Sequence, residues 1–136
     1  MIIVDASVFT KWVVPERGTA AALNLRAEQI AAPTIWIAEC ANVLWRHVRM
    51  KELSESEAAE RLSSLRSADV QQISLEELMS EAFLFANQLG HPVYDCLYLS
   101  AAVRNNTRVV TADRRFVSAV SRHSGLGRHI ELLVGI

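Results

Sequence analysis

Cysteine and glycine are scarce in this sequence, and both shortages exclude kinds of protein. Cys40 and Cys96 are the two cysteines among 136 residues. Each lies in an apolar helical pattern without metal-ligand spacing, which predicts buried, reduced thiols and no zinc site. The five glycines are spread along the chain, so no glycine-rich phosphate loop is present. No Gly-x-Ser-x-Gly motif and no Cys–His pair supports covalent catalysis. The four histidines are scattered, and we expect them to be structural or exposed: His47, His91, His123 and His129.

Long apolar runs are also missing. No run approaches the roughly 18 residues that a membrane-spanning helix needs. The chain reaches Asp5 before a secretory signal could form. We therefore expect a soluble, cytoplasmic protein with no membrane contact. Hydrophobic residues make up 51% of the chain and charged residues 21%, which is typical of a globular protein. Neither a repeat nor a linker divides residues 1–136, so we interpret them as one domain.

Lysine is scarce as well, with two lysines against twelve arginines. Arginine suits bidentate contacts with phosphate, but arginine-rich usage also follows from genome base composition, and both interpretations stay open. The net charge of −1 does not by itself indicate a nucleic-acid-binding protein. Arg114 and Arg115 directly follow Asp113, and Lys11 follows Asp5 closely. These basic residues could contact phosphates, although an ordinary surface role fits them equally well.

Short apolar strands alternate with amphipathic helices along the chain. The opening run to Val4 is β-branched, as in buried parallel strands, and residues 108–111 form the second clear strand. Ser7 is expected to cap the first helix, and capping boxes at Ser54 and Ser74 open two later ones. The alternation predicts an α/β fold. Helices are expected at 7–15, 19–30, 37–48, 54–68, 74–90, 94–104 and 115–122, with further extended segments around 33, at 70–73 and at 130–133.

Four acidic residues fall where a site is expected. Asp5 ends the first strand, and Asp113 closely follows the strand at 108–111. In open α/β sheets, sites form outside the carboxyl ends of strands, where the strand order reverses. The two aspartates therefore emerge side by side if their strands are neighbours. Asp95 opens the apolar helix at 94–104 and can point to the same edge. Glu39 lies in a stretch with no other charge.

Each acid also has an ordinary structural explanation. Asp5 and Asp95 could cap helices, Asp113 could end a strand in a turn, and Glu39 could be an exposed helix residue. Together, however, four converging acids repel one another unless a cation neutralises them. Oxygen ligands favour Mg²⁺ or Mn²⁺ over zinc or copper. A metal-bound water can attack phosphorus, so phosphodiester hydrolysis is the predicted chemistry.

Four segments of the chain form a recognisable set. They are Ile3-Val4-Asp5-Ala6-Ser7-Val8 followed by Lys11-Trp12 and Pro15-Glu16, then Glu39-Cys40-Ala41-Asn42-Val43-Leu44, Tyr94-Asp95-Cys96-Leu97-Tyr98, and Thr111-Ala112-Asp113-Arg114-Arg115-Phe116. In this order, and over essentially the whole chain, they resemble the VapC toxin group of PIN-domain proteins. The resemblance implies a three-layer α/β/α fold with a short, mainly parallel sheet. It also implies an endoribonuclease that uses Mg²⁺ or Mn²⁺ and leaves 5′-phosphate and 3′-hydroxyl ends.

The resemblance further implies roles for residues and partners. It assigns catalysis and metal binding to Asp5, Glu39, Asp95 and Asp113. It assigns the positioning of carboxylates or waters to Ser7, Asn42 and Thr111. RNA is the implied substrate. A small antitoxin protein that blocks the site is the implied partner, and a homodimer is the implied assembly.

Other functions fit the sequence less well. A haloacid-dehalogenase-like phosphatase needs a second aspartate two residues after the first, where Ser7 stands. A receiver domain needs paired acids after its first strand, but Asp5 is alone, and Asp69 precedes its strand instead of following it. Two readings within the PIN family stay open, an RNA-maturation nuclease and a degenerate domain used only for binding. The intact acids argue against the second.

Overall fold

A five-stranded parallel sheet forms the centre of the molecule. The computed structural model describes residues 1–136. Its strands are β1 (Ile2–Val4), β2 (Ile30–Pro33), β3 (Val70–Ile73), β4 (Val109–Thr111) and β5 (Ile130–Leu132). They lie in the order β3-β2-β1-β4-β5, and every neighbouring pair is parallel. The predicted α/β fold is confirmed, and its sheet is parallel throughout.

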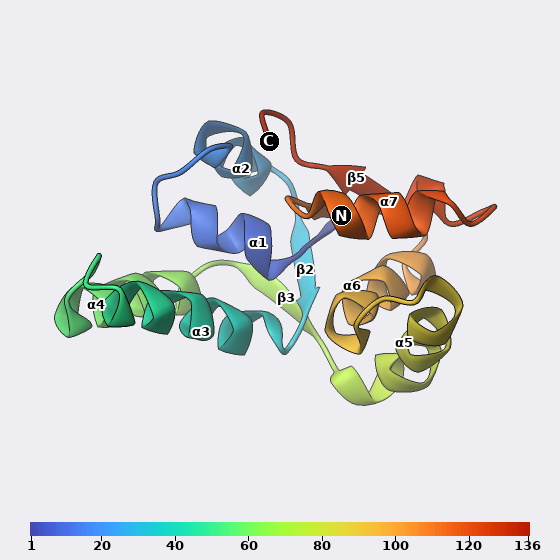
Figure 1. Cartoon of the computed structure of the whole chain (residues 1–136), viewed down its shortest axis with the longest axis horizontal. Coiled ribbons are helices and arrows are strands. Elements are labelled where there is room, and N and C mark those ends of the chain that lie inside the picture. Colours follow the sequence, from blue (N-terminus) through green and yellow to red (C-terminus); the bar gives the residue numbers. More distant parts are fainter.

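Seven α-helices flank the sheet (Figure 1). They are α1 (Ala6–Phe9), α2 (Thr19–Asn24), α3 (Trp36–Arg49), α4 (Glu55–Arg66), α5 (Leu75–Leu89), α6 (Val93–Arg104) and α7 (Arg114–Ser121). Three 3₁₀ segments accompany them: η1 (Thr10–Trp12), η2 (Leu25–Ala27) and η3 (Gly127–His129). Helices α3 and α4 pack together as an arm at the left of Figure 1, and α5 packs against α6 at the lower right. None of these helices is both long enough and apolar enough to cross a bilayer.

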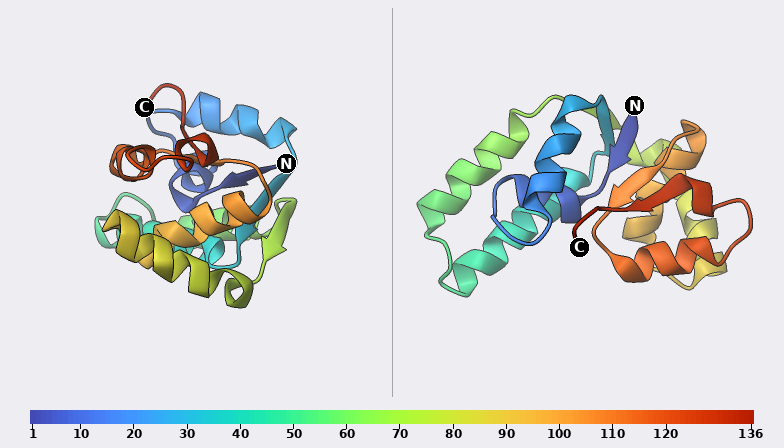
Figure 2. Two further views of the ribbon diagram at one scale, coloured as in Figure 1. Left: turned by 90° about the vertical axis from the view of Figure 1, so that its right-hand side faces the viewer. Right: turned by 90° about the horizontal axis from the view of Figure 1, so that it is seen from above.

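Helices cover both faces of the sheet. In the left view of Figure 2, α2 and α7 lie on one side of it, and α5 and α6 lie on the other. Helix α6 packs directly on β1 and β2. Its residues from Cys96 to Ala102 are each at most 1% exposed. The helix that is apolar almost all round is therefore buried, as predicted. Cys40 and Cys96 are buried free thiols, which is also as predicted.

Two caps differ from the prediction. Asp5, and not Ser7, caps α1, because the Asp5 carboxylate accepts the backbone N–H of Ser7. The capping box expected at Ser74 is wrong, since that side chain makes no hydrogen bond to α5. The box of Ser54 and Glu57 at the start of α4 is confirmed, with both of its hydrogen bonds present.

Two helix boundaries also differ. Helix α2 ends at Asn24 and continues as η2, whereas a helix reaching Ile30 was expected. Ile30 and Ala31 pair with β1 on one side and β3 on the other. This burial in the sheet outweighs the high helix propensity of alanine. Helix α6 begins at Val93, so Asp95 occupies its third position and does not cap it.

Candidate metal centre

The strand order places a cleft at the carboxyl ends of β1 and β4. The order runs from β1 through β2 to β3 in one direction and from β4 to β5 in the other, so it reverses between β1 and β4. Asp5 directly follows β1, and Asp113 follows β4 by two residues. Both line a cleft of about 490 Å³, together with Glu39 from α3 and Asp95 from α6. Four segments of the chain thus bring the four acids around one cavity.

Asp5 is held through both of its carboxylate oxygens. Oδ1 accepts the backbone N–H of Ser7 at 3.1 Å and the Ser7 hydroxyl at 2.5 Å. Oδ2 accepts the hydroxyl of Thr111 at 2.5 Å. Burial raises the pKa of Asp5 to about 7, against the effect of these hydrogen bonds, and the charges of Asp95 and Glu39 add to the rise. Ser7 and Thr111 thus orient a carboxylate whose negative charge is poorly solvated.

Glu39 faces the cleft from the first turn of α3. The hydroxyl of Tyr98 donates a hydrogen bond to its Oε1 atom at 2.5 Å. Burial raises the pKa of Glu39, the hydrogen bond from Tyr98 opposes the rise, and the charge of Asp95 adds to it. Glu39 is half-buried and lines the cleft. Its interpretation as an exposed helix residue is therefore wrong.

Asp95 is paired with His91, four residues before it. The Nε2 atom of His91 lies 2.6 Å from Oδ2 of Asp95. The imidazole ring is stacked on Phe116, with ring centroids 5.0 Å apart and planes 11° apart. Burial raises the pKa of Asp95, the pairing with His91 lowers it, and the charge of Asp113 raises it again. His91 therefore has a fixed place beside the acids.

Asp113 caps α7 as well as lining the cleft. Its Oδ1 atom accepts the backbone N–H groups of Arg115 at 2.9 Å and Phe116 at 3.2 Å. Its backbone N–H in turn donates to the hydroxyl of Thr111 at 3.1 Å. Its structural role is thus that of a helix cap, and not only of a residue that ends a strand in a turn; the cap uses one carboxylate oxygen and leaves the other free.

The closest group of possible ligands contains a nitrogen in addition to carboxylates. His91, Asp95 and Asp113 each offer a ligand atom within 4.8 Å of the others. Asp5 and Glu39 lie outside this group, but the charges of Asp95 and Glu39 raise the pKa of Asp5, and the charge of Asp95 raises the pKa of Glu39. Such a donor set fits a divalent cation, which would relieve the repulsion between the carboxylates. The roles of the four acids as metal ligands stay a prediction.

Comparison with known families accounts for most of the chain. Residues 2–120 match the family model of the PIN domain. The chain belongs to the PIN-domain family. It is similar to Ribonuclease VapC3 of Pyrobaculum aerophilum, with 32% identity over 120 residues. The match covers 84% of this chain and 90% of that relative, and the PIN domain is therefore VapC-like.

Solved structures share the fold of this PIN domain at low sequence identity. Mycobacterium tuberculosis VapC20 (Rv2549c), a sarcin-ricin loop cleaving toxin, has a TM-score of 0.69 and 15% identity, over 88% of this chain and 95% of that one. A toxin–antitoxin complex from Klebsiella pneumoniae has a TM-score of 0.69 and 14% identity, over 100% of both chains. These likenesses concern the fold alone, and they confirm the three-layer α/β/α architecture.

Lys11, Arg114 and Arg115, for which phosphate contact and a surface role were both left open, do not line the cleft of the PIN domain. Lys11 is buried, and its ammonium group donates to Glu16 at 3.0 Å and to the backbone carbonyl of Arg17 at 2.7 Å. It is therefore neither a cleft residue nor a surface residue. Arg114 and Arg115 are exposed at the start of α7. The basic residue that does line the cleft is Arg46, on α3.

Sequence reasoning missed several cleft residues. Tyr98 lines the cleft three residues after Asp95 on α6, a spacing that places both side chains on one face of a helix. That spacing was the available signal for Tyr98, whereas His91, which pairs with Asp95 from outside the helix, had none. Asn42 was expected to hold a carboxylate or a water. It lines the cleft from α3, but its side chain makes no hydrogen bond to the acids.

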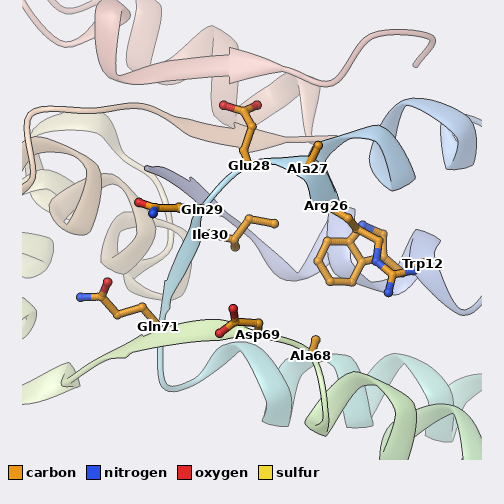
Figure 3. A pocket seen from close by; sticks show the side chains of 9 residues that line it. All are labelled: Trp12, Arg26, Ala27, Glu28, Gln29, Ile30, Ala68, Asp69 and Gln71. Atoms are coloured by element: carbon orange, nitrogen blue, oxygen red, sulfur yellow. The ribbon is translucent and has the colours of Figure 1, made fainter.

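A second cleft lies at the opposite end of the strands (Figure 3). It measures about 580 Å³ and is lined by residues near the amino ends of β2 and β3, including Glu28 and Asp69. The guanidinium group of Arg26 lies over the ring of Trp12 there, 5.5 Å from its centroid. This cleft is larger than that of the acids, but it contains no group of three possible metal ligands. Size alone therefore does not identify the functional site of this PIN domain.

Proposed function

We propose that this PIN domain is a VapC-type ribonuclease toxin that hydrolyses RNA phosphodiester bonds with a divalent metal ion. The observation that carries the proposal is the meeting of Asp5, Glu39, Asp95 and Asp113 at the strand-order reversal between β1 and β4. These four residues would hold Mg²⁺ or Mn²⁺. The bound ion would supply an acidified water and stabilise the leaving oxygen. Family membership and the likeness to Ribonuclease VapC3 support the assignment.

The protein's own contribution is the positioning of the carboxylates. The hydroxyls of Ser7 and Thr111 fix Asp5, and the hydroxyl of Tyr98 fixes Glu39. These donors are set before substrate arrives, so little reorganisation is needed when charge develops on a phosphate. Asn42, whose side chain has no protein partner, is placed to bind a water at the edge of the cleft.

Cleavage assays with purified protein test the proposed chemistry. RNA cleavage should require Mg²⁺ or Mn²⁺ and stop in EDTA. Asp5→Asn and Asp95→Asn should each lower the rate by orders of magnitude, because a lost ligand removes both activation of the water and charge stabilisation. Asp69→Asn is the matched control, since Asp69 lies in the other cleft. Full activity in EDTA, or a fully active Asp95→Asn protein, would exclude a metal-dependent site.

We also propose an antitoxin partner that covers the acidic cleft, and a homodimeric assembly. A toxin–antitoxin complex among the similar structures supports the partner. Expression of the wild-type chain should slow growth, Asp95→Asn at equal abundance should be tolerated, and an antitoxin should restore growth. If neither the wild type nor Asp95→Asn slows growth, an RNA-maturation nuclease or a domain that only binds would be favoured. Light scattering should give twice the mass of one chain, and a monomer mass would exclude the dimer.

A further inference from the structure

The cleft extends beyond the acids along one face of α3. Ile35, which precedes α3, and five residues of α3 line it at spacings of three, four, seven, eight and eleven positions from Ile35: Ala38, Glu39, Asn42, Val43 and Arg46. This spacing places them on the same face of the helix. Glu39 and Arg46 are two helical turns apart, or about 10 Å along the axis. Along this face Glu39 and Arg46 are thus separated by Asn42 and Val43, so the cleft is acidic at Glu39 and basic at Arg46.

Tyr94 adds an exposed aromatic ring to this cleft. It belongs to α6, directly before Asp95, and lines the same cavity. It is 61% exposed, although large aromatic side chains are usually well buried. A ring left open beside a hydrolytic centre offers a face on which a nucleobase can stack.

Arg46 is the one basic residue lining the cleft. Its guanidinium group makes no ion pair and no hydrogen bond within the chain, whereas the nearby Arg49 lies over the ring of Trp45. A free guanidinium group suits the bidentate binding of a phosphate. Its distance from Glu39 places it beyond the acids, where it would meet a neighbouring phosphate of the same strand.

We propose that Tyr94 and Arg46 form an RNA-binding subsite of this cleft, with one unpaired base stacked on Tyr94 and an adjacent phosphate bound by Arg46. The inference rests on the proposed ribonuclease function and names two residues that contact RNA beside the acids. Bases inside a duplex are covered on both faces by their neighbours, so only an unstacked base presents a face to Tyr94. Ile35 and Val43 add apolar surface to the cleft.

Anisotropy titrations test the stacking without requiring cleavage. The probe is a labelled 12-nucleotide uridine RNA, with Ca²⁺ in place of Mg²⁺. Tyr94→Leu should weaken binding about tenfold or more, and Tyr94→Phe should bind as the wild type does, because base–aromatic stacking needs the ring and not the hydroxyl. Phe83→Leu is the matched control, since Phe83 is 58% exposed on α5 and does not line the cleft.

A probe of equal length without bases separates stacking from backbone contacts. Wild-type protein should bind this abasic chain about tenfold more weakly than the uridine chain. Tyr94→Leu should bind the two chains equally. When the uridine chain is paired with its complement, wild type and Tyr94→Leu should bind the duplex with equal affinity. If Tyr94→Leu still distinguishes the two single-stranded chains as the wild type does, the base does not stack there and the proposal is wrong.

Salt dependence tests the phosphate contact. Arg46→Gln should reduce the slope of log Kd against log salt concentration by about 0.7, which is the value for one phosphate contact on a single strand. The reduction should be the same for the uridine and abasic chains. Arg49→Gln, one turn further along α3, should leave the slope unchanged. An unchanged slope in Arg46→Gln would overturn the proposed phosphate site.

Binding and cleavage results together separate this inference from the proposed function. If the protein cleaves RNA with a metal but Tyr94→Leu does not change RNA binding, the proposed ribonuclease function holds and the inference about Tyr94 is wrong. The expected binding pattern in a protein that cleaves no RNA would support the inference and overturn the proposed function.

Discussion

Each acid of the cleft is oriented by a hydrogen-bond partner within the protein. Two hydroxyls hold Asp5, a phenol holds Glu39, and two backbone N–H groups hold Asp113. Asp95 differs because its partner is the imidazole of His91, a side chain that is itself stacked on Phe116. Groups of this kind fix the direction of ligand atoms and therefore affect how tightly a metal is held.

The first prediction concerns His91. His91→Phe should keep a ring stacked on Phe116 but remove the nitrogen beside Asp95, leaving that carboxylate free to rotate. Mn²⁺ affinity, measured by calorimetric titration, should fall about tenfold, which is the lower end of the effect usual for such partners. His47→Phe is the matched control, because His47 lies 2.6 Å from Glu52 on the surface, away from the cleft. Unchanged Mn²⁺ affinity in His91→Phe would show that His91 does not position Asp95.

The acids of the cleft could be predicted from local sequence patterns, whereas most of the partners that hold them could not. Asp5 was found because it ends an apolar run. Its partner Thr111 was noticed only through a family resemblance, since 106 residues separate the two. The pairing of Glu39 with Tyr98 spans 59 residues and has no local pattern. His91 lies between Gly90 and Pro92, outside α6, so helical periodicity did not single it out.

At the scale of elements, the starts of helices carry the site. Asp5 caps α1, Asp113 caps α7, and Glu39 and Asp95 lie in the first turns of α3 and α6. The positive end of a helix dipole lies at its amino end and favours nearby negative charge. Four helices therefore start around the same cleft, and each contributes one acid.

Strands and helices differed in how well the sequence predicted them. The β-branched residues of β1 and the nearly all-apolar α6 gave clear signals, and the structure confirms both. The end of α2 was misplaced because Ala27, Ala31 and Ala32 continue a helix-favouring composition into β2. What makes β2 a strand is its pairing with β1 and β3, and the β3 partners lie about forty residues further along the chain. Local propensity cannot report such long-range pairing.

The second prediction separates the two functions of Asp113 at the start of α7. Asparagine caps a helix about as well as aspartate, whereas alanine does not. In EDTA, Asp113→Asn should be at least as stable as the wild type, because it keeps the cap and removes repulsion with Asp95. Asp113→Ala should be about 1 kcal/mol less stable than Asp113→Asn in urea denaturation.

Mn²⁺ provides the second readout for these variants. It should stabilise the wild type but stabilise either variant at position 113 much less, because both lack a carboxylate ligand. Ser54→Ala is the control, since it removes the cap of α4 without touching the cleft. In EDTA, its free energy of unfolding should fall by about as much as that of Asp113→Ala. Mn²⁺ should stabilise it by as much as it stabilises the wild type. Equal stabilisation of Asp113→Asn and wild type by Mn²⁺ would remove Asp113 from the metal site.

At the scale of the whole molecule, the sheet joins the two ends of the chain. Residues 2–4 and 130–132 are both strands of it, and β4 lies between them. Because neither end can leave without breaking the sheet, we propose that residues 1–136 unfold as one domain, in a single transition. The acidic cleft lies at the β1–β4 junction of that sheet, so its electrostatic strain acts on the free energy of unfolding of the entire chain.

The last prediction concerns this strain and pH. Burial raises the pKa of Asp5 to about 7 from its ordinary value of 3.8, so between these values the folded chain keeps a proton that the unfolded chain releases. The free energy of unfolding in EDTA should therefore fall as the pH rises from about 4 to about 7. The difference between the two pKa values corresponds to roughly 4 kcal/mol at most. Glu39 and Asp95, whose pKa values are also raised, act in the same direction.

Urea denaturation at pH 4, 5.5 and 7.5 measures this dependence. Asp5→Asn should flatten the decline in EDTA and be more stable than the wild type at pH 7.5, whereas Asp69→Asn, outside the cleft, should follow the wild type. Mn²⁺ should reverse the slope for the wild type, because it binds the deprotonated carboxylates of the folded chain and binds them better as protons leave. Ordinary paired or capping carboxylates have lowered pKa values and would make stability rise with pH even in EDTA. A wild-type protein that gains stability from pH 4 to 7 in EDTA would therefore show that burial and like charge do not raise the pKa values of these acids.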